Sequence, residues 1–163
     1  MDTSRPPATP IGLFLSQSAR VVARAFDEVL EEAGGSLPVW LILLNLTIRR
    51  PDNQRELAEA VGVREATLTH HLNAMDTRGL ITRRRDETNR RIHVVELTED
   101  GQALFLRLRD VAFAFDTQLR NGLEDADLDT LRALLGRLAA NVQPGADAAE
   151  GTMPWAGLAE SGA

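Results

Sequence analysis

The 163-residue chain contains no cysteine and no lysine, and none of its apolar runs is long enough to cross a bilayer. The lack of cysteine excludes disulfide bonds. Without about 20 consecutive apolar residues there is no candidate membrane-spanning helix. The first residues, which include Arg5, Pro6, Pro7 and Pro10, do not resemble a signal peptide. These absences predict a cytoplasmic protein without a membrane partner.

Positive charge is outweighed over the whole chain but concentrated in one segment. The formal net charge of -6 on its own argues against a nucleic-acid partner. Acidic residues gather at 27–32 and 124–129, whereas in the segment 78–91 only Asp86 and Glu87 oppose a run of arginines. Such a segment can present a basic face to phosphates, and the alternative is a solvated hairpin with surplus arginines. The arginines are Arg78, Arg83, Arg84, Arg85, Arg90 and Arg91.

A short amphipathic helix is predicted to follow Asn53. Asparagine is a favoured N-cap residue, and Glu56 stands where it can reciprocate as in a capping box. Gly62 suits the left-handed backbone that ends a helix and begins a tight turn. The inward stripe of this helix is Leu57, Ala58 and Val61.

A second helix and a hairpin follow this turn. Leu68, Leu72 and Met75 recur at helical spacing, so small polar side chains remain on the other faces of the helix. Gly79 ends the helix, and extended runs on either side of the loop 85–91 form a hairpin. A helix, a turn, a second helix and a hairpin in this order predict a winged helix-turn-helix.

The rest of the chain is predicted to be helical, which makes the fold mainly α with a small β-wing. Apolar residues recur at helical steps over 11–32, 98–121 and 124–142. Ser36 caps a further helix, which requires burial on most sides because of its apolar residues Leu41, Ile42, Leu43, Leu44 and Leu46. We expect the first and the last two helices to interleave with those of a second chain, and a monomeric helical core is the alternative. The expected interface side chains include Phe105, Leu108, Phe113 and Phe115.

Three short motifs carry a resemblance to a known family. They are Leu-Pro-x-Trp at 37–40, Arg-Gly-Leu at 78–80 and Leu-Thr-Glu-x-Gly at 97–101. Together they resemble the MarR (multiple antibiotic resistance regulator) family, most clearly over 36–100 and more weakly over 11–142. The resemblance implies a dimeric prokaryotic transcriptional regulator, often a repressor. Its recognition helices enter successive major grooves, about 34 to 36 Å apart, while the wings reach flanking minor grooves.

The resemblance also implies which residues contact DNA. It places recognition-helix contacts on Thr67, Thr69 and His70 and the wing-tip arginine on Arg91. Two positions depart from the family pattern: Asn89 replaces a common aspartate, and His70 stands where many members carry an arginine, the usual reader of guanine. The predicted DNA-binding residues are Arg64, Thr67, Thr69, His70, Asn73, Arg83, Arg85, Arg90 and Arg91.

A small phenolic or aromatic acid is the effector that the resemblance implies. Such a ligand, bound between the winged helix and the dimerisation helices, would change the separation of the two recognition helices. Phe14 and Trp40 are the candidate effector-binding residues, and the alternative is that both belong to the core. The absence of cysteine excludes the thiol-based peroxide sensing of some relatives.

Metal binding and catalysis find little support. His70 and His71 point about 100° apart on a helix, and neither these residues nor His93 have a carboxylate or thiol at ligand spacing. No nucleophile, phosphate-loop or paired-carboxylate signature is visible. We therefore predict no metal, no cofactor and no enzyme activity.

The chain is predicted to divide into five parts. The alternative to a DNA-binding regulator is a winged-helix module that binds protein and has no specific affinity for DNA. In the C-terminal part, Trp155 has no assigned role. The parts are a disordered N-terminus (1–10), a dimerisation helix (11–35), the winged helix-turn-helix (36–98), C-terminal dimerisation helices (99–143) and a disordered tail (144–163).

Overall fold

The computed structural model describes residues 9–49, 51, 53–85 and 93–142. Most of the predicted N-terminal tail, the centre of the wing loop and the whole C-terminal tail lie outside these ranges. Within them the fold is mainly helical with one antiparallel hairpin, as predicted. The elements are α1 (Ile11–Glu32), α2 (Leu37–Ile48), α3 (Gln54–Val61), α4 (Glu65–Thr77), β1 (Ile81–Arg85), β2 (His93–Leu97), α5 (Glu99–Leu119) and α6 (Asp125–Val142).

Helix α2 lies at the centre of the fold. The Ser36 hydroxyl accepts a hydrogen bond from the backbone N–H of Val39 at 3.5 Å. Asp27 of α1 accepts another from the N–H of Leu37 at 2.7 Å. Both therefore satisfy donors that the first turn of a helix leaves free. Elements α1, α3, α4, α5 and β2 all pack against α2, which confirms that this apolar helix is buried on most sides.

The junction between the hairpin and α5 explains the Leu-Thr-Glu-x-Gly motif. The Thr98 hydroxyl accepts a hydrogen bond from the N–H of Gly101 at 3.0 Å and donates one to the Gly79 carbonyl at 2.6 Å. A Cβ atom at Gly101 would overlap the carbonyl oxygen of Leu80. Threonine and glycine together thus allow the first turn of α5 to lie against the end of the α4–β1 connection.

The first half of α5 belongs to the core. Phe105 and Leu108 are 2% and 0% exposed, and Phe105 stacks on Trp40 with ring centroids 5.7 Å apart. The expectation that these two side chains face a second chain is therefore wrong. The apolar residues in the first turns of α5 therefore cover α2. Farther along, Phe115 packs on Phe26 and Phe113 is 39% exposed.

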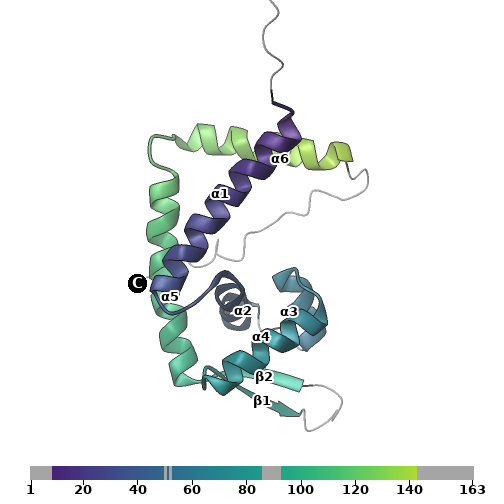
Figure 1. The fold of residues 1–163 in the computed structure, drawn as a ribbon, viewed down its shortest axis with the longest axis vertical. Coiled ribbons are helices and arrows are strands. Elements are labelled where there is room, and N and C mark those ends of the chain that lie inside the picture. The colour runs from purple at the N-terminus through teal and green to yellow at the C-terminus, as the bar shows by residue number, and fades with distance from the viewer. Residues whose placement is uncertain (1–8, 50, 52, 86–92, 143–163) are drawn as a thin grey trace, which may run out of the picture.

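Two helices at the other end of α5 leave apolar side chains exposed. Figure 1 shows α5 extending from the winged helix to the end of the molecule where α6 and the start of α1 lie. Helix α6 contributes no buried residue, and every residue of α1 from Ile11 to Arg20 is exposed. We call the following residues the uncovered apolar surface: Ile11, Leu13, Phe14, Leu15, Val21, Leu131, Leu134 and Leu135.

None of the described helices is by itself long and apolar enough to cross a membrane. Helices α1 and α2 meet that test only as a pair, by length and composition alone, and they are bent by 77°.

Replacing Gly101 with alanine should destabilise the fold. The new methyl group would overlap the Leu80 carbonyl, and overpacking of this kind costs about 1–3 kcal/mol of unfolding free energy. Gly12→Ala is the matched control in the first turn of α1, because no atom lies within 4 Å of a Cβ there. Its unfolding free energy should stay level or rise by at most about 1 kcal/mol. Urea denaturation followed by circular dichroism measures both, and equal stabilities would contradict the close approach.

Candidate nucleic-acid interface

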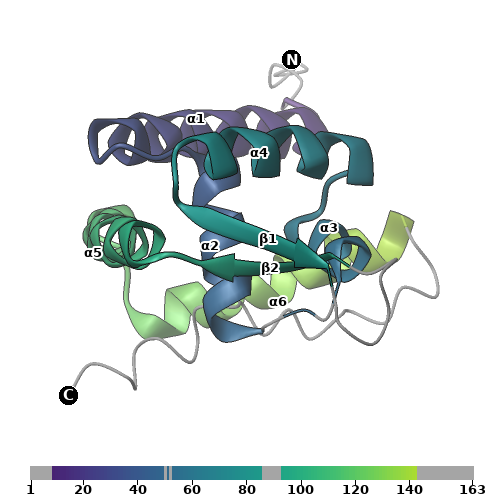
Figure 2. The ribbon, with the colours of Figure 1, turned by 90° about the horizontal axis from the view of Figure 1, so that it is seen from below.

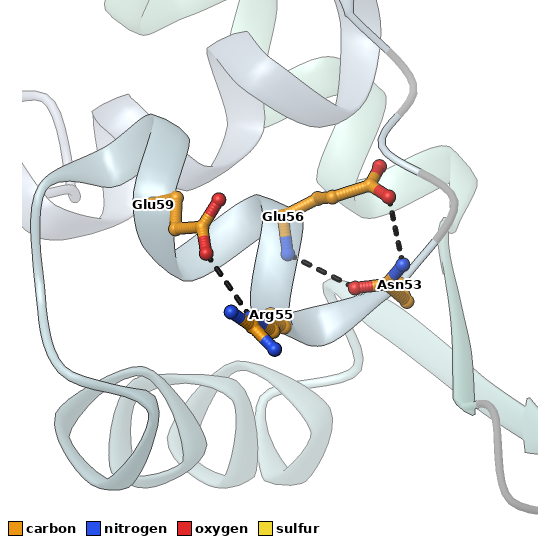
Figure 3. Close-up of polar contacts among 4 residues, drawn as sticks. All are labelled: Asn53, Arg55, Glu56 and Glu59. Carbon is orange, nitrogen blue, oxygen red and sulfur yellow. Dashed lines mark hydrogen bonds and ion pairs between the residues drawn. The ribbon is translucent and has the colours of Figure 1, made fainter.

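Helix α3 begins at a side-chain cap formed by Asn53 (Figure 3). The side-chain oxygen Oδ1 of Asn53 accepts a hydrogen bond from the N–H of Glu56 at 3.0 Å. The Asn53 amide donates to the Glu56 carboxylate at 2.9 Å, so Glu56 reciprocates, as predicted, and does so at the side chain of Asn53. Arg55 and Glu59 form an ion pair of 3.2 Å on the exposed face of the same helix.

The turn between α3 and α4 fits the helix-turn-helix prediction. Gly62 has φ 77°, in the left-handed region, and its N–H donates back to the carbonyls of Ala58 and Glu59. Helix α4 begins at Glu65 and buries Leu68, Leu72 and Met75, as the sequence predicts. Its opposite face therefore remains available for a partner.

Helix α4 lies beside the β1–β2 hairpin at one end of the molecule (Figure 2). In the hairpin, Ile81 pairs with Leu97 and Arg83 with Val95. Successive side chains of a strand point to opposite faces. Arg83 therefore shares the face of Ile81, which is buried against the core at 1% exposure. Arg84 lies on the other face.

The neighbouring arginines Arg83 and Arg84 have different partners. Nη1 of Arg83 donates to the side-chain oxygen Oδ1 of Asn73 at 2.6 Å, which links β1 to α4. Arg84 binds the Glu96 carboxylate of β2 through Nε at 3.2 Å and Nη2 at 2.9 Å. These hydrogen bonds and the positive charge of Arg84 lower the pKa of Glu96 below its ordinary value. Glu96 is thus an acidic partner of the arginine run that the sequence analysis missed.

Arg78 also has a structural partner. Its Nη2 donates to the carbonyl oxygen of Gly34 at 2.9 Å. This bond connects the C-terminal end of α4 to the turn between α1 and α2. The bonds of Arg78 and Arg84 show that part of the basic run holds the fold together. Fewer arginines are therefore available to phosphates than their number in the sequence implies.

Six of the predicted DNA-binding residues lie on α4, at its N-cap or on β1, and all six are at least partly exposed. Arg64, Thr67, His70 and Asn73 are exposed, and Thr69 and Arg83 are half-buried. Thr69 also donates to the Glu65 carbonyl at 2.9 Å. Arg85 is the last residue of β1, whereas Arg90, Arg91 and Asn89 lie outside the described residues.

The two candidate effector-binding residues lie in different surroundings. Phe14 is 58% exposed on α1, whereas Trp40 is 3% exposed and stacked on Phe105. An open hollow of about 420 Å³ between α1 and α5 is lined by Val29, Phe115 and neighbouring residues, and it includes neither candidate. The structure therefore does not bring Phe14 and Trp40 together around this hollow.

The described part of the chain contains no group of three or more His, Cys, Asp or Glu side chains able to hold a metal ion. The rings of His70 and His71 meet edge to face, with centroids 5.8 Å apart. His93 is the first residue of β2.

Known proteins share both this fold and part of this sequence. Residues 36–93 match the model of the MarR family. A transcriptional regulator from Pseudomonas aeruginosa is 29% identical with a TM-score of 0.68, and the match covers 79% of this chain and 96% of that one. The repressor CouR of Rhodococcus jostii RHA1, solved with a 23-mer DNA duplex, is 25% identical with a TM-score of 0.69 and coverages of 80% and 92%. These matches confirm the winged-helix class and the resemblance to MarR.

Removing the Asn53 cap should weaken the helix-turn-helix. In Asn53→Ala the N–H of Glu56 loses its acceptor, and N-cap losses cost about 1 kcal/mol of unfolding free energy. Arg55→Ala is a control in the same helix. The side chains of Arg55 and its partner Glu59 are 77% and 67% exposed, and such exposed ion pairs contribute about 0.5 kcal/mol or less to the unfolding free energy. Thermal and urea unfolding compare the two variants. A larger loss in Arg55→Ala would contradict the role of the cap.

Proposed function

We infer from the match of residues 36–93 to the MarR family model that this chain is a homodimeric repressor of transcription, which binds a pseudo-palindromic DNA operator and is released by a small aromatic ligand. The observation that carries the proposal is the exposed polar face of α4 beside the arginine-bearing strand β1. Members of the MarR family are transcriptional regulators, and the comparisons support the same general role for this chain. The repressor role, the dimer, the operator and the ligand are our proposals.

DNA recognition is supported by the placement of α4. A recognition helix docks in the major groove with its first turns at the base edges. The proposed groove contacts are Arg64, Thr67, Thr69, His70 and Asn73. Arginines of the hairpin would contact phosphates or the adjacent minor groove, where guanidinium groups replace released counterions. These are Arg83 and Arg85 at the strand and Arg90 and Arg91 in the wing.

A second copy of the chain would cover the uncovered apolar surface. Leu131 and Leu134 of α6 are each 49% exposed, and Phe14 and Val21 of α1 are 58% and 70% exposed. Large exposed apolar patches mark interaction sites. With α1 and the C-terminal helices paired across a two-fold axis, the two α4 helices would read half-sites one duplex turn apart. The proposed domain division assigns 11–35 and 99–143 to this dimer and 36–98 to DNA.

The proposed effector is a small aromatic acid. CouR, a relative of the same fold, was solved with p-coumaroyl-CoA. In this chain the proposed site includes Phe14 and Trp40, and Trp40 packs on Phe105, which is buried in the core with α2. A ligand that displaces Phe105 would shift α5 against the winged helix, because α5 supports both the core and the uncovered apolar surface.

The operator prediction is tested by selecting duplex DNA on the purified protein. We expect enrichment of a pseudo-palindrome, and Arg91→Ala should bind it more weakly, with the slope of log affinity against log salt reduced by about 1. Arg132→Ala is the control for loss of one positive charge, because Arg132 lies on α6 and pairs with Asp129 at 2.9 Å.

Two outcomes would contradict the function. Enrichment of a single half-site would contradict the dimer while leaving DNA binding intact. Retention of DNA without sequence preference, equal for wild type and Arg91→Ala, would instead favour the winged-helix module that binds protein.

The effector prediction is tested with p-coumarate, p-coumaroyl-CoA and benzoate on the selected operator. Allosteric coupling is typically about 5- to 150-fold, so an effective ligand should weaken operator affinity by at least about fivefold. In Trp155→Phe, Trp40 is the sole tryptophan, and ligand binding should change its fluorescence in step with release. Release without a change at Trp40 would place the ligand elsewhere, and Phe14→Ala tests the second residue by the same titration.

A further inference from the structure

We propose that Arg83 determines base specificity by holding Asn73, so that the Asn73 amide presents only hydrogen-bond donors to the major groove and favours guanine over adenine. The inference rests on the proposed DNA-binding function and concerns one position within each half-site. In this arrangement Arg83 is a positioning residue, and Asn73 is the residue that touches the base.

The contact between the two residues is short and joins separate elements. The distance from Arg83 Nη1 to Asn73 Oδ1 is 2.6 Å, across ten residues from α4 to β1. Arg83 is half-buried, because it follows Ile81 on the core-facing side of the strand. Hydrogen bonds from a guanidinium are stronger than neutral ones. The exposed Asn73 side chain is therefore held at a defined orientation on the surface of α4.

The orientation of the amide follows from the chemistry of arginine. A guanidinium carries only donors, so the atom of Asn73 that faces it must be the oxygen. The amide nitrogen, which has two hydrogens, then points away from Arg83. Asn73 has no other described side-chain bond, whereas its backbone carbonyl accepts from the Thr77 hydroxyl at 2.9 Å.

This orientation changes which base the side chain can read. An unrestrained asparagine reads adenine by donating to N7 and accepting from the N6 amino group. With its oxygen turned towards Arg83, the Asn73 amide faces the groove with its nitrogen, and the adenine amino group would meet another donor. Guanine presents two acceptors, N7 and O6, at the same groove edge. The held amide nitrogen of Asn73 therefore presents donors that match guanine.

The neighbouring arginine provides the matched control. Arg84 carries the same charge on the same strand, but it lies on the opposite face and binds Glu96. Loss of Arg84 therefore removes one positive charge from β1 without freeing Asn73. A difference between the Arg83 and Arg84 variants in base preference cannot come from net charge.

The experiment repeats the duplex selection with wild type, Arg83→Ala, Asn73→Ala and Arg84→Ala. We expect wild type to select guanine at one position of each half-site. Arg83→Ala frees the Asn73 oxygen, so the ratio of adenine to guanine at that position should rise by about fivefold or more, the size of one good base contact. Asn73→Ala should lose the preference there, and Arg84→Ala should keep the wild-type preference at every position.

The outcomes separate this inference from the proposed function. An enriched operator whose base preferences are the same in wild type, Arg83→Ala and Asn73→Ala would overturn the inference and leave the function standing. Absence of any enriched sequence with wild type would overturn both. Because Asn73 is exposed, Asn73→Ala should melt at the wild-type temperature, and it keeps the test decisive if Arg83→Ala proves unstable.

Discussion

Burial of α2 on most sides is the constraint on which the rest of the fold depends. Ile42, Leu43 and Leu44 are consecutive, so their side chains point about 100° apart around the helix axis, yet all three are 0% exposed. A helix buried on a single face cannot achieve this. Neighbours must surround it, and α1, α3, α4, α5 and β2 do so. The position of α4 is thus set in part by its packing on α2.

Most elements of the fold could be predicted from the sequence, because their ends carry local signals. The N-caps Asn53, Ser36 and Thr98 and the left-handed Gly62 act within a few residues of chain. The helical spacing of apolar residues likewise predicted the buried side chains of α3 and α4. Such signals need no knowledge of tertiary structure, which explains why the predicted helix limits lie within a few residues of the observed ones.

The site was less predictable, because its arginines act through long-range partners. Arg78 binds a carbonyl 44 residues away and Arg84 binds Glu96 across the hairpin. A count of charges cannot reveal either bond. The alternation of side chains along β1 separates Arg83 from Arg84, but their partners Asn73 and Glu96 depend on how the hairpin pairs and packs. Similarly, the apolar stripe of α5 did not indicate that Phe105 covers Trp40 while Phe113 remains exposed.

Covering of helix α6 by a second copy, as proposed above, would make the stability of this chain depend on its concentration. The helix buries no side chain of its own, while Leu131, Leu134 and Leu135 remain open to water. If a second copy covers them, the apolar area buried on association stabilises the folded state, and this stabilisation grows with protein concentration by mass action. Newly made chains at low copy number would expose these leucines to proteases and be removed first. The cell would then contain either enough of the protein to form pairs or very little of it.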